Sequence, residues 1–292
     1  MRATLGAVRI VSLLPSTTEI LFAIGAGQDV VGVTFECDFP PEARTRRIVS
    51  TSAMPEGLTP KEIDDFVVAA TAAGQDLYRL DEGALADLDA DLVVTQDLCA
   101  VCAVDVSVVD DALAHLGCTA EVLTLDPHTL DEVFATIHTL GRATGREDAA
   151  ASLVAGLHAR LAEVVRRVAH RPRPRVVLLE WTDPPFAPGH WIPEMIDLAG
   201  GEPVLGVAGA KSVRTTWADV DAARPDLVVV APCGYDRAGA RALADEIAGE
   251  LPSGVRVHAV DADAAWARPG PRLLDGIEEL ARVLDEMCAS SA

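Results

Sequence analysis

The chain has 292 residues, of which 50% are hydrophobic and 24% are charged, as in a soluble globular protein rather than a disordered or fibrous one. Its formal net charge of −21 argues against binding to nucleic acid and to anionic membrane surfaces, because both require basic patches. The length is sufficient for a large hydrophobic core and for two domains of ordinary size.

The first residues, MRATLGAVRIVSLLPSTTE, do not have the pattern of a secretory signal, because the apolar run between Arg9 and Pro15 is too short. No run approaches the about 18 apolar residues of a transmembrane helix. The sequence therefore predicts a cytoplasmic protein without membrane insertion. In that compartment the six cysteines are expected to be thiols or metal ligands rather than disulfides.

The first half of the chain alternates predicted strands with predicted helices. The first strand ends before Pro15, and Ser16 with Glu19 has the pattern of a capping box that opens the first helix. Alternation of this kind indicates a parallel, doubly wound sheet. The predicted strands are 9–14, 29–34, 91–96 and 121–126, with a strand and turn at 76–83, and the predicted helices are 19–24, 61–74, 84–88 and 106–116.

A long helix is predicted from Arg146 to Arg171. Acidic residues begin it, basic residues crowd its end, and Pro172 stops it. About 25 residues correspond to a rod of roughly 37 Å, enough to cross a small domain. The residues spaced to form its apolar face are Leu153, Leu157, Leu161, Val164, Val165 and Val168.

The pattern of the first half returns after the long helix. RVVLLE from Arg175 matches RIVSLL from Arg9, and DLVVVA from Asp226 matches DLVVTQ from Asp91. The segment VHAVD likewise matches VLTLD, and this match and that of DLVVVA with DLVVTQ both have an offset of 135 residues. Such matches indicate an internal duplication. We therefore expect two similar α/β lobes joined by one long rigid helix: an N-terminal lobe 1–127, a helical linker 128–171 and a C-terminal lobe 172–292.

Aromatic residues gather where the predicted strands end. Three of the four tryptophans, Trp181, Trp191 and Trp266, lie at strand ends in loops rich in proline and glycine. Ligands of open parallel sheets bind beyond the carboxyl ends of the strands. The sequence therefore predicts, in a cleft between the lobes, a pocket that stacks on a large flat ligand.

Several segments, in order along nearly the whole chain, resemble the cobalamin-binding proteins that serve ABC importers. They are RIVSLLPSTTEILFAIGAGQDVVGV from Arg9, CDFPPEA from Cys37, DPPF from Asp183, DLAGGE from Asp197, Trp217 with Ala218 and Asp219, and RPGPRLLDGIEELA from Arg268. The resemblance implies a class III periplasmic-binding-protein-like fold that clasps cobalamin or a related corrinoid between its lobes. It also implies a monomer that is not an enzyme and that docks on an ABC-transporter permease, although family members are usually periplasmic or lipid-anchored.

The resemblance also implies site residues. Its pocket aromatic falls on Trp266, its Pro-Pro-Phe loop on Pro185 and Phe186, and its second-lobe indole on Trp217, while Tyr78 is the candidate for a missing loop aromatic. Acidic side chains that dock on the importer fall near Glu82 and Asp219. The full set of expected ligand-binding residues is Ser16, Thr17, Cys37, Asp38, Tyr78, Gln96, Trp181, Pro185, Phe186, His190, Trp191, Trp217, Trp266 and Arg268.

Three of these residues have a structural alternative. Ser16 fits a capping box as well as a ligand contact. His190 is either a cobalt ligand through its imidazole or a loop histidine that only forms hydrogen bonds. Arg268 either pairs with a ligand oxygen or holds its own turn.

The cysteines support a second hypothesis. Cys99 and Cys102 form a C-x-x-C at a strand end, and Cys37 and Cys233 lie at other strand ends. Zinc or an iron–sulfur cluster takes four such thiolates. The alternative is therefore a cytoplasmic metal- or iron–sulfur-binding protein or enzyme, although buried cysteines also serve as small hydrophobic residues. No Ser-His-Asp set, Walker loop or H-E-x-x-H motif suggests a reaction.

Overall fold

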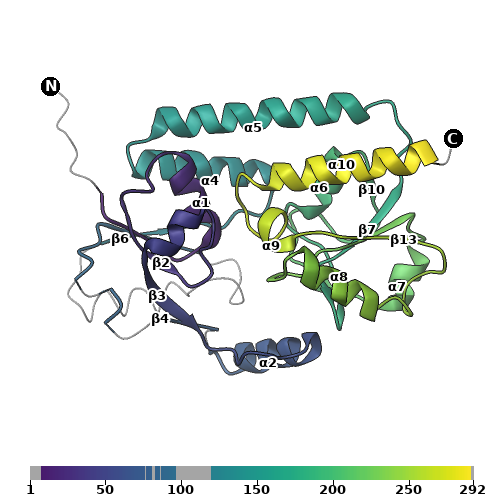
Figure 1. The fold of residues 1–292 in the computed structure, drawn as a ribbon, viewed down its shortest axis with the longest axis horizontal. Helices are drawn as coiled ribbons and strands as arrows, with labels where there is room; N and C mark the ends of the chain where they lie inside the picture. Colours follow the sequence, from purple (N-terminus) through teal and green to yellow (C-terminus); the bar gives the residue numbers. More distant parts are fainter. Residues whose placement is uncertain (1–7, 76, 81–82, 86, 97–119, 291–292) are drawn as a thin grey trace. The chain divides into compact units, whose positions relative to one another are not determined.

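The computed structural model describes residues 8–75, 77–80, 83–85, 87–96 and 120–290 (Figure 1). The described residues between 8 and 126, together with Ala135–Val154, form one compact unit, here called unit 1. Pro127–Phe134 and residues 155–290 form the other, unit 2. Helices α4 (Leu130–Ala143) and α5 (Glu147–Val168) therefore have residues in both units.

Unit 1 is built on a six-stranded sheet with the order β4-β3-β2-β1-β5-β6, parallel except for the edge strand β4. The parallel α/β arrangement predicted from the alternating pattern is confirmed. Among the described residues, 83–85 form a turn rather than the predicted helix, and the predicted helix 106–116 lies outside them. The elements are β1 (Ile10–Ser12), α1 (Pro15–Ala23), β2 (Val30–Thr34), η1 (Pro41–Thr45), β3 (Arg47–Ser52), α2 (Pro60–Ala72), β4 (Tyr78–Leu80), β5 (Leu92–Thr95) and β6 (Glu121–Thr124).

Helix α1 starts earlier than predicted. It begins at Pro15, whose fixed backbone angle suits the first helical position, and Leu14 precedes it without a side-chain cap. The predicted capping box between Ser16 and Glu19 is therefore wrong, because both residues already lie inside the helix. The hydroxyl groups of this first turn are directed into a buried network instead.

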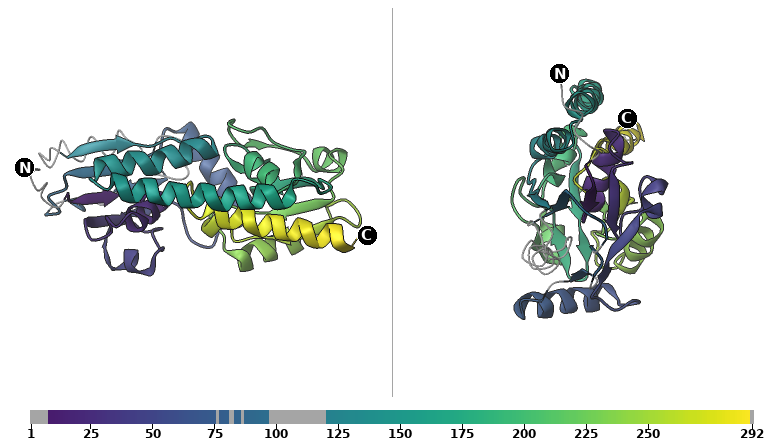
Figure 2. Two further views of the ribbon diagram at one scale, coloured as in Figure 1. Left: turned by 90° about the horizontal axis from the view of Figure 1, so that it is seen from above. Right: turned by 90° about the vertical axis from the view of Figure 1, so that its left-hand side faces the viewer.

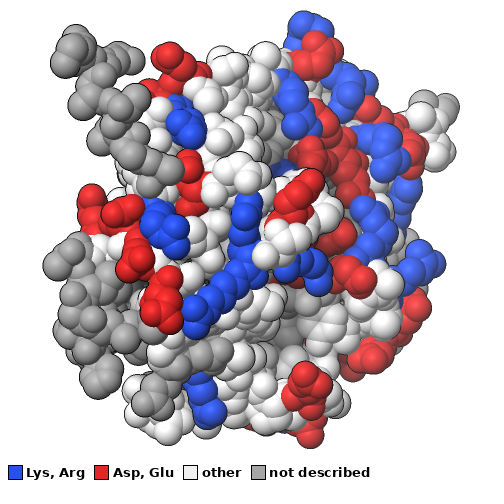
Figure 3. Space-filling view, turned by 60° about the vertical axis from the view of Figure 1, so that its left-hand side comes forward, with Lys and Arg blue, Asp and Glu red and all other residues white. Residues whose placement is uncertain are grey.

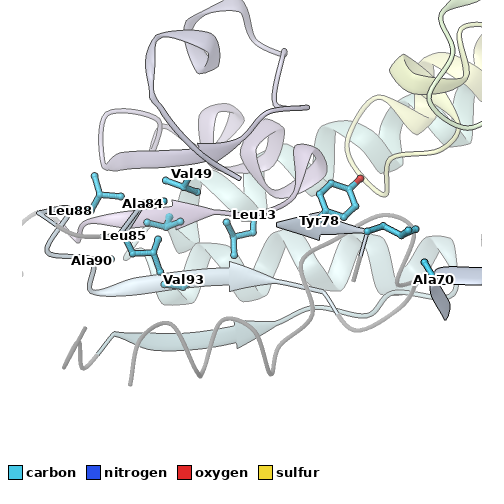
Figure 4. Close-up of a cluster of buried hydrophobic side chains, with 11 residues drawn as sticks. Leu13, Val49, Ala70, Tyr78, Ala84, Leu85, Leu88, Ala90 and Val93 are labelled. Carbon is cyan, nitrogen blue, oxygen red and sulfur yellow. The ribbon is translucent and has the colours of Figure 1, made fainter. Parts of the chain in front are cut away.

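One face of the unit 1 sheet is covered by a hydrophobic cluster (Figure 4). Val49 and Val93 come from β3 and β5, Leu13 directly follows β1, and Leu85 and Leu88 come from the segment that precedes β5. All five side chains are at most 6% exposed. Burial of apolar surface stabilises the fold by about 25 cal/mol per Å², so Leu85 and Leu88 help to hold their segment against the sheet.

Unit 2 contains a parallel sheet with the order β10-β7-β12-β13 and helices on both faces. Val177 and Val228 pack with α7 and α8 on one face. Val176, Ile196 of α6 and Leu284 of α10 meet on the other face, around Gly201. The elements are β7 (Arg175–Leu179), β8 (Trp181–Thr182), β9 (Pro185–Ala187), α6 (Ile192–Leu198), β10 (Glu202–Pro203), β11 (Val213–Arg214), α7 (Trp217–Ala222), β12 (Leu227–Val230), α8 (Arg237–Glu246), β13 (Arg256–Ala259), α9 (Ala262–Ala265) and α10 (Leu273–Ser290).

The two sheets share one plan. The order β2-β1-β5-β6 in unit 1 corresponds to β10-β7-β12-β13 in unit 2. Their registers agree as well, because Ile10 lies beside Leu92 and Val176 lies beside Leu227. These are the residues that the repeated segments align, so the structure supports the internal duplication inferred from the sequence.

A backbone clamp at the start of each central strand repeats with the fold. The Arg9 amide donates to a carboxylate oxygen of Asp91 at 2.8 Å, and the Asp91 amide donates back to the Arg9 carbonyl at 2.8 Å. The Arg175 amide donates to Asp226 at 2.7 Å, and the Asp226 amide donates back at 2.8 Å. The two aspartates therefore have a structural role at the amino ends of the strands.

Helix α5 is one unbroken helix of 22 residues (Figure 2). At about 1.5 Å per residue it is roughly 33 Å long, close to the predicted length. Leu157 and Val164 are buried as expected, but Val165 is 40% exposed and Val154 is buried in its place. The actual stripe follows the three-and-four spacing through 150, 154, 157, 161 and 164, which excludes Val165.

Charges of both signs are mixed on the face drawn in Figure 3. In unit 2, Arg160 of α5 donates to Glu278 at 2.9 Å and to Asp275 of α10 at 2.6 Å. Pairs this exposed contribute about 0–1 kcal/mol each to the free energy of folding.

Within the described ranges, no helix is both long and apolar enough to span a lipid bilayer.

The structure predicts an acid-sensitive element in unit 2. Burial raises the pKa of Glu279, but hydrogen bonds from His258 (2.8 Å) and Arg237 (2.7 Å) outweigh this effect. The pKa is therefore lowered from its ordinary value of 4.5 to about 2. A depressed carboxyl pKa stabilises the fold above the unfolded-state pKa, and this contribution is lost as the pH falls from about 4.5 to about 2. We expect Glu279→Gln to flatten the pH dependence of the unfolding free energy in that window, measured by urea denaturation. The exposed Glu250→Gln is the control, and identical pH profiles for Glu279→Gln and wild type would contradict the prediction.

Candidate functional site

The carboxyl end of β7 leads directly into a small antiparallel sheet. Its strand order is β11-β9-β8, and the turn between β8 and β9 contains Asp183 and Pro184. The sequence predicts only loops here, because each strand has two or three residues and Pro185 begins β9. This sheet lies at the edge where ligands of parallel α/β sheets bind.

The side chains of the small sheet alternate between a buried and an accessible face. Thr182, Pro185 and Ala187 are buried. Trp181 lies directly across from Phe186, so their side chains share the other face, and both are half-buried. Trp181 and Phe186 are therefore partly accessible and lie side by side, whereas Pro185 lies on the inner face.

Two further side chains extend this pair of rings. Arg214 lies across from Phe186 on β11, with its guanidinium carbon 5.9 Å from the ring centroid. Tyr235, in the loop after β12, meets Trp181 edge to face with ring centroids 5.8 Å apart. Burial, followed by the charge of Glu246, raises the pKa of Tyr235, so its hydroxyl stays protonated at neutral pH. We call Trp181, Phe186, Arg214 and Tyr235 the aromatic row.

The other three tryptophans lie elsewhere in unit 2. Trp266 is 1% exposed, and Trp191 is 4% exposed with its indole nitrogen donating to the Trp266 carbonyl at 2.8 Å. Trp217 begins α7 and packs against the core cluster that includes Val220 and Val228. Stacking on a ligand requires an accessible ring face, and the burial of Trp191 and Trp266 argues against that role for both.

The surroundings of His190 argue against a cobalt ligand, and Arg268 follows its structural alternative. The His190 ring lies beside the rings of His128 and Trp191, at 5.6 Å from each, and its Nε2 atom is buried. A buried Nε2 does not offer a nitrogen to a cobalt ion. Arg268 has a side chain only 10% exposed and donates to Asp263 at 3.1 Å, so it holds its own turn.

At the corresponding edge of unit 1, several described side chains bond to one another. Ser12 and Thr17 hydroxyls lie 2.6 Å apart, and Thr18 donates to Ser12 at 2.8 Å. The Thr18 hydroxyl also lies 3.0 Å from the Cys37 sulfur. These side chains are buried, as are Ser16 and Gln96, so the expected ligand contacts Ser16, Thr17, Cys37 and Gln96 lie in the interior of unit 1.

Tyr78 and Asp38 have partners within unit 1. Tyr78 is 7% exposed, belongs to the hydrophobic cluster and donates its hydroxyl to Glu36 at 2.7 Å. Phe35 stands 5.7 Å from the Tyr78 ring and is the more exposed of the two. Asp38 pairs with Arg44 at 3.7 Å on the surface.

The described residues contain no group of three or more His, Cys, Asp or Glu side chains arranged to hold a metal ion. Cys37 is buried in unit 1, and Cys233 is exposed in unit 2. Cys99 and Cys102 lie outside the described residues, so the predicted four-thiolate site for zinc or an iron–sulfur cluster stays a prediction.

Two members of the aromatic row are absent from the ligand-binding residues expected from the sequence. Arg214 lies in a segment, KSVRTT, that has no recognisable motif. Tyr235 follows Cys233 and Gly234 at a predicted strand end, so the sequence predicts its position at this edge. The sequence does not predict its contact with Trp181. Cross-strand pairing in the small sheet is what brings Arg214 to this edge.

Comparisons with known proteins give consistent matches along the chain. The family model described as "Periplasmic binding protein" matches residues 10–252. The uncharacterized ABC transporter substrate-binding lipoprotein YvrC of Bacillus subtilis is 28% identical over 291 residues, which cover 94% of this chain and 78% of YvrC.

Two solved structures show the same fold at low identity. The periplasmic heme-binding protein RhuT from Roseiflexus sp. RS-1, in its apo form, superposes with a TM-score of 0.68 at 24% identity, over 94% of this chain and 97% of RhuT. The periplasmic vitamin B12 binding protein BtuF of Vibrio cholerae superposes with a TM-score of 0.65 at 21% identity, over 95% of this chain and 96% of BtuF.

The burial of Trp266 yields a stability prediction. Its ring packs so closely on α10 that a side chain on Gly276 would approach ring carbon Cε2 to 3.0 Å. We expect Trp266→Ala to lower the free energy of unfolding by about 3–5 kcal/mol, because it leaves a large cavity in the core of unit 2. Chemical denaturation followed by circular dichroism measures this change. The half-buried Trp181→Ala is the matched control, and an equal or larger loss in that variant would contradict the assignment of Trp266 to the core.

Proposed function

Because the chain belongs to the periplasmic binding protein family, we propose that it is the substrate-binding protein of an ABC importer and that its cargo is a planar, metal-chelating macrocycle. Cobalamin or a related corrinoid is the first candidate, and heme is the second. The protein in this proposal binds and delivers its cargo without chemical change.

The aromatic row is the observation that carries this proposal. Trp181 and Phe186 are held side by side by cross-strand pairing, and Tyr235 packs against the indole of Trp181. Large, rigid aromatic side chains bury much apolar area at a small cost in conformational entropy, which suits an extended flat ring. The row lies at the carboxyl edge of the unit 2 sheet, where ligands of open α/β sheets bind.

The relatives support a macrocycle and leave two candidates. RhuT is a heme-binding protein and BtuF is a vitamin B12 binding protein, and both cargoes contain a large, nearly planar ring around a metal ion. Heme carries carboxylates, whereas the corrin ring of cobalamin carries mostly neutral amides. Arg214 is exposed beside Phe186, and a guanidinium binds a carboxylate with two parallel hydrogen bonds. This residue is the reason why heme is kept as the second candidate.

We also propose a location outside the cytoplasmic membrane and a permease as the partner. The matching family is described as periplasmic, and YvrC is a lipoprotein. The cytoplasmic location expected from the first residues has no support in these comparisons.

Ligand titration tests the proposal. Cyanocobalamin or hemin should bind and quench tryptophan fluorescence, and Trp181→Ala should weaken the binding of that cargo. Loss of one stacked indole corresponds to about 1–3 kcal/mol, or about 5- to 150-fold in the dissociation constant. Trp217→Phe is the control, because Trp217 packs on the core, and its dissociation constant should match that of the wild type.

The titrations test the proposed cargo and the proposed site separately. If hemin is the cargo, Arg214→Gln should weaken its binding and leave the binding of its dimethyl ester unchanged. Absence of binding by any corrinoid or porphyrin at high micromolar concentration would overturn the proposed cargo. Unchanged affinity in Trp181→Ala would overturn the proposed site.

A further inference from the structure

Unit 1 contains an open groove beside α1, and all of its lining residues belong to that unit. It has a volume of about 420 Å³, within the range of about 300–1,000 Å³ that small-molecule sites occupy. Three of its residues, Glu19, Phe22 and Ala23, follow the spacing of one helical face. The full lining is Glu19, Phe22, Ala23, Gln28, Phe39, Pro40 and Glu42, here called the α1 groove.

We propose that the α1 groove binds an organic cation, an ammonium or guanidinium group on a short apolar body. Two phenyl rings and two carboxylates line it, and neither lysine nor arginine is among the lining residues. Aromatic faces and carboxylates together are the chemistry that recognises such cations. The α1 groove shares no residue with the aromatic row, so this proposal can be tested independently of the proposed cargo.

The walls of the groove are fixed before any ligand binds. Phe22 lies so close to Gly27 that a Cβ there would approach ring carbon Cδ1 to 2.5 Å. The Arg46 guanidinium lies 5.7 Å from the centroid of the same ring and donates to the Gly27 carbonyl at 2.8 Å. The Arg46 guanidinium and the close contact with Gly27 together hold the Phe22 ring in place. A wall held in this way loses little conformational entropy on binding.

The two carboxylates differ in their exposure. Glu19 is 4% exposed, whereas Glu42 is exposed on the first turn of η1. A carboxylate removed from bulk water attracts a cation more strongly than an exposed one, because the local dielectric constant is lower. Phe39, 42% exposed, lies two residues before Pro41 at the start of η1 and provides an accessible apolar surface. We assign the charge recognition to Glu19 and Glu42, and the contact with the apolar body to Phe39.

Calorimetric titration of the full chain with n-butylguanidinium tests the proposal, with the uncharged n-butylurea as the matched ligand. We expect a dissociation constant on the order of 1 mM for the guanidinium, as for a ligand of this size. Glu42→Gln and Phe39→Ala should each weaken binding by about 2- to 30-fold. Gly27→Ala must displace the Phe22 ring, so this variant should weaken the binding of n-butylguanidinium without a change of net charge.

Matched variants in the same unit control for folding and net charge. Glu56→Gln removes one exposed carboxylate and Phe35→Ala one exposed ring, and both residues lie outside the groove. Both variants should bind n-butylguanidinium as the wild type does. Equal binding of the urea, undiminished binding in Glu42→Gln and Phe39→Ala, or no binding at about 10 mM would each overturn the proposal.

A second arm identifies the source of the cation. A short capped peptide with one arginine presents the same guanidinium as a partner protein would. Tighter binding of the peptide than of n-butylguanidinium assigns the groove to a partner's side chain, and the reverse order assigns it to a free amine or guanidine. Titration with cyanocobalamin and hemin in the same variants should be unaffected, which separates failure of this site from failure of the proposed cargo.

Discussion

The clamp at the start of each central strand is the constraint on which the rest of the structure depends. Arg9 and Asp91 exchange backbone and side-chain hydrogen bonds in unit 1, and Arg175 and Asp226 do so in unit 2. Each clamp fixes where two neighbouring parallel strands begin, and therefore where both of them end. A shift of one residue in this register would exchange the two faces of the strand. The carboxyl edge of each sheet is thus determined at its opposite end.

In unit 2 this constraint leads directly to the aromatic row. The end of β7 determines where β8 begins, and antiparallel pairing then alternates side chains between the interior and the accessible face. Trp181 and Phe186 are accessible because Thr182 and Pro185 are the residues that face inward. In unit 1 the described residues at the equivalent edge include hydroxyl groups and a thiol that bond to one another.

The sequence was sufficient to predict the fold class, whereas the site residues stay a prediction. Repeated segments predicted two similar parallel sheets, because hydrophobic strands and their spacing depend on local pattern. The small sheet was missed, since strands of two or three residues containing proline have no periodicity to detect. Burial of Trp191 and Trp266 was also beyond sequence reasoning, because a strand-end position does not say which way a ring turns. The same limit applies to Ser16 and Thr17, which resembled a cap or ligand contact and proved to be interior residues of α1.

The central claim is that a macrocycle rests on the aromatic row, and hydroxyl-radical footprinting read by mass spectrometry tests it most directly. The oxidation rates of Trp181 and Phe186 should fall when saturating cyanocobalamin or hemin is added, because the cargo covers their accessible faces. Phe39, which lies in unit 1 and is 42% exposed, provides an accessible ring outside the row as the reference. Protection of Trp181 and Phe186 with little change at Phe39 is the predicted result. Binding of the cargo without protection of either Trp181 or Phe186 would contradict the account.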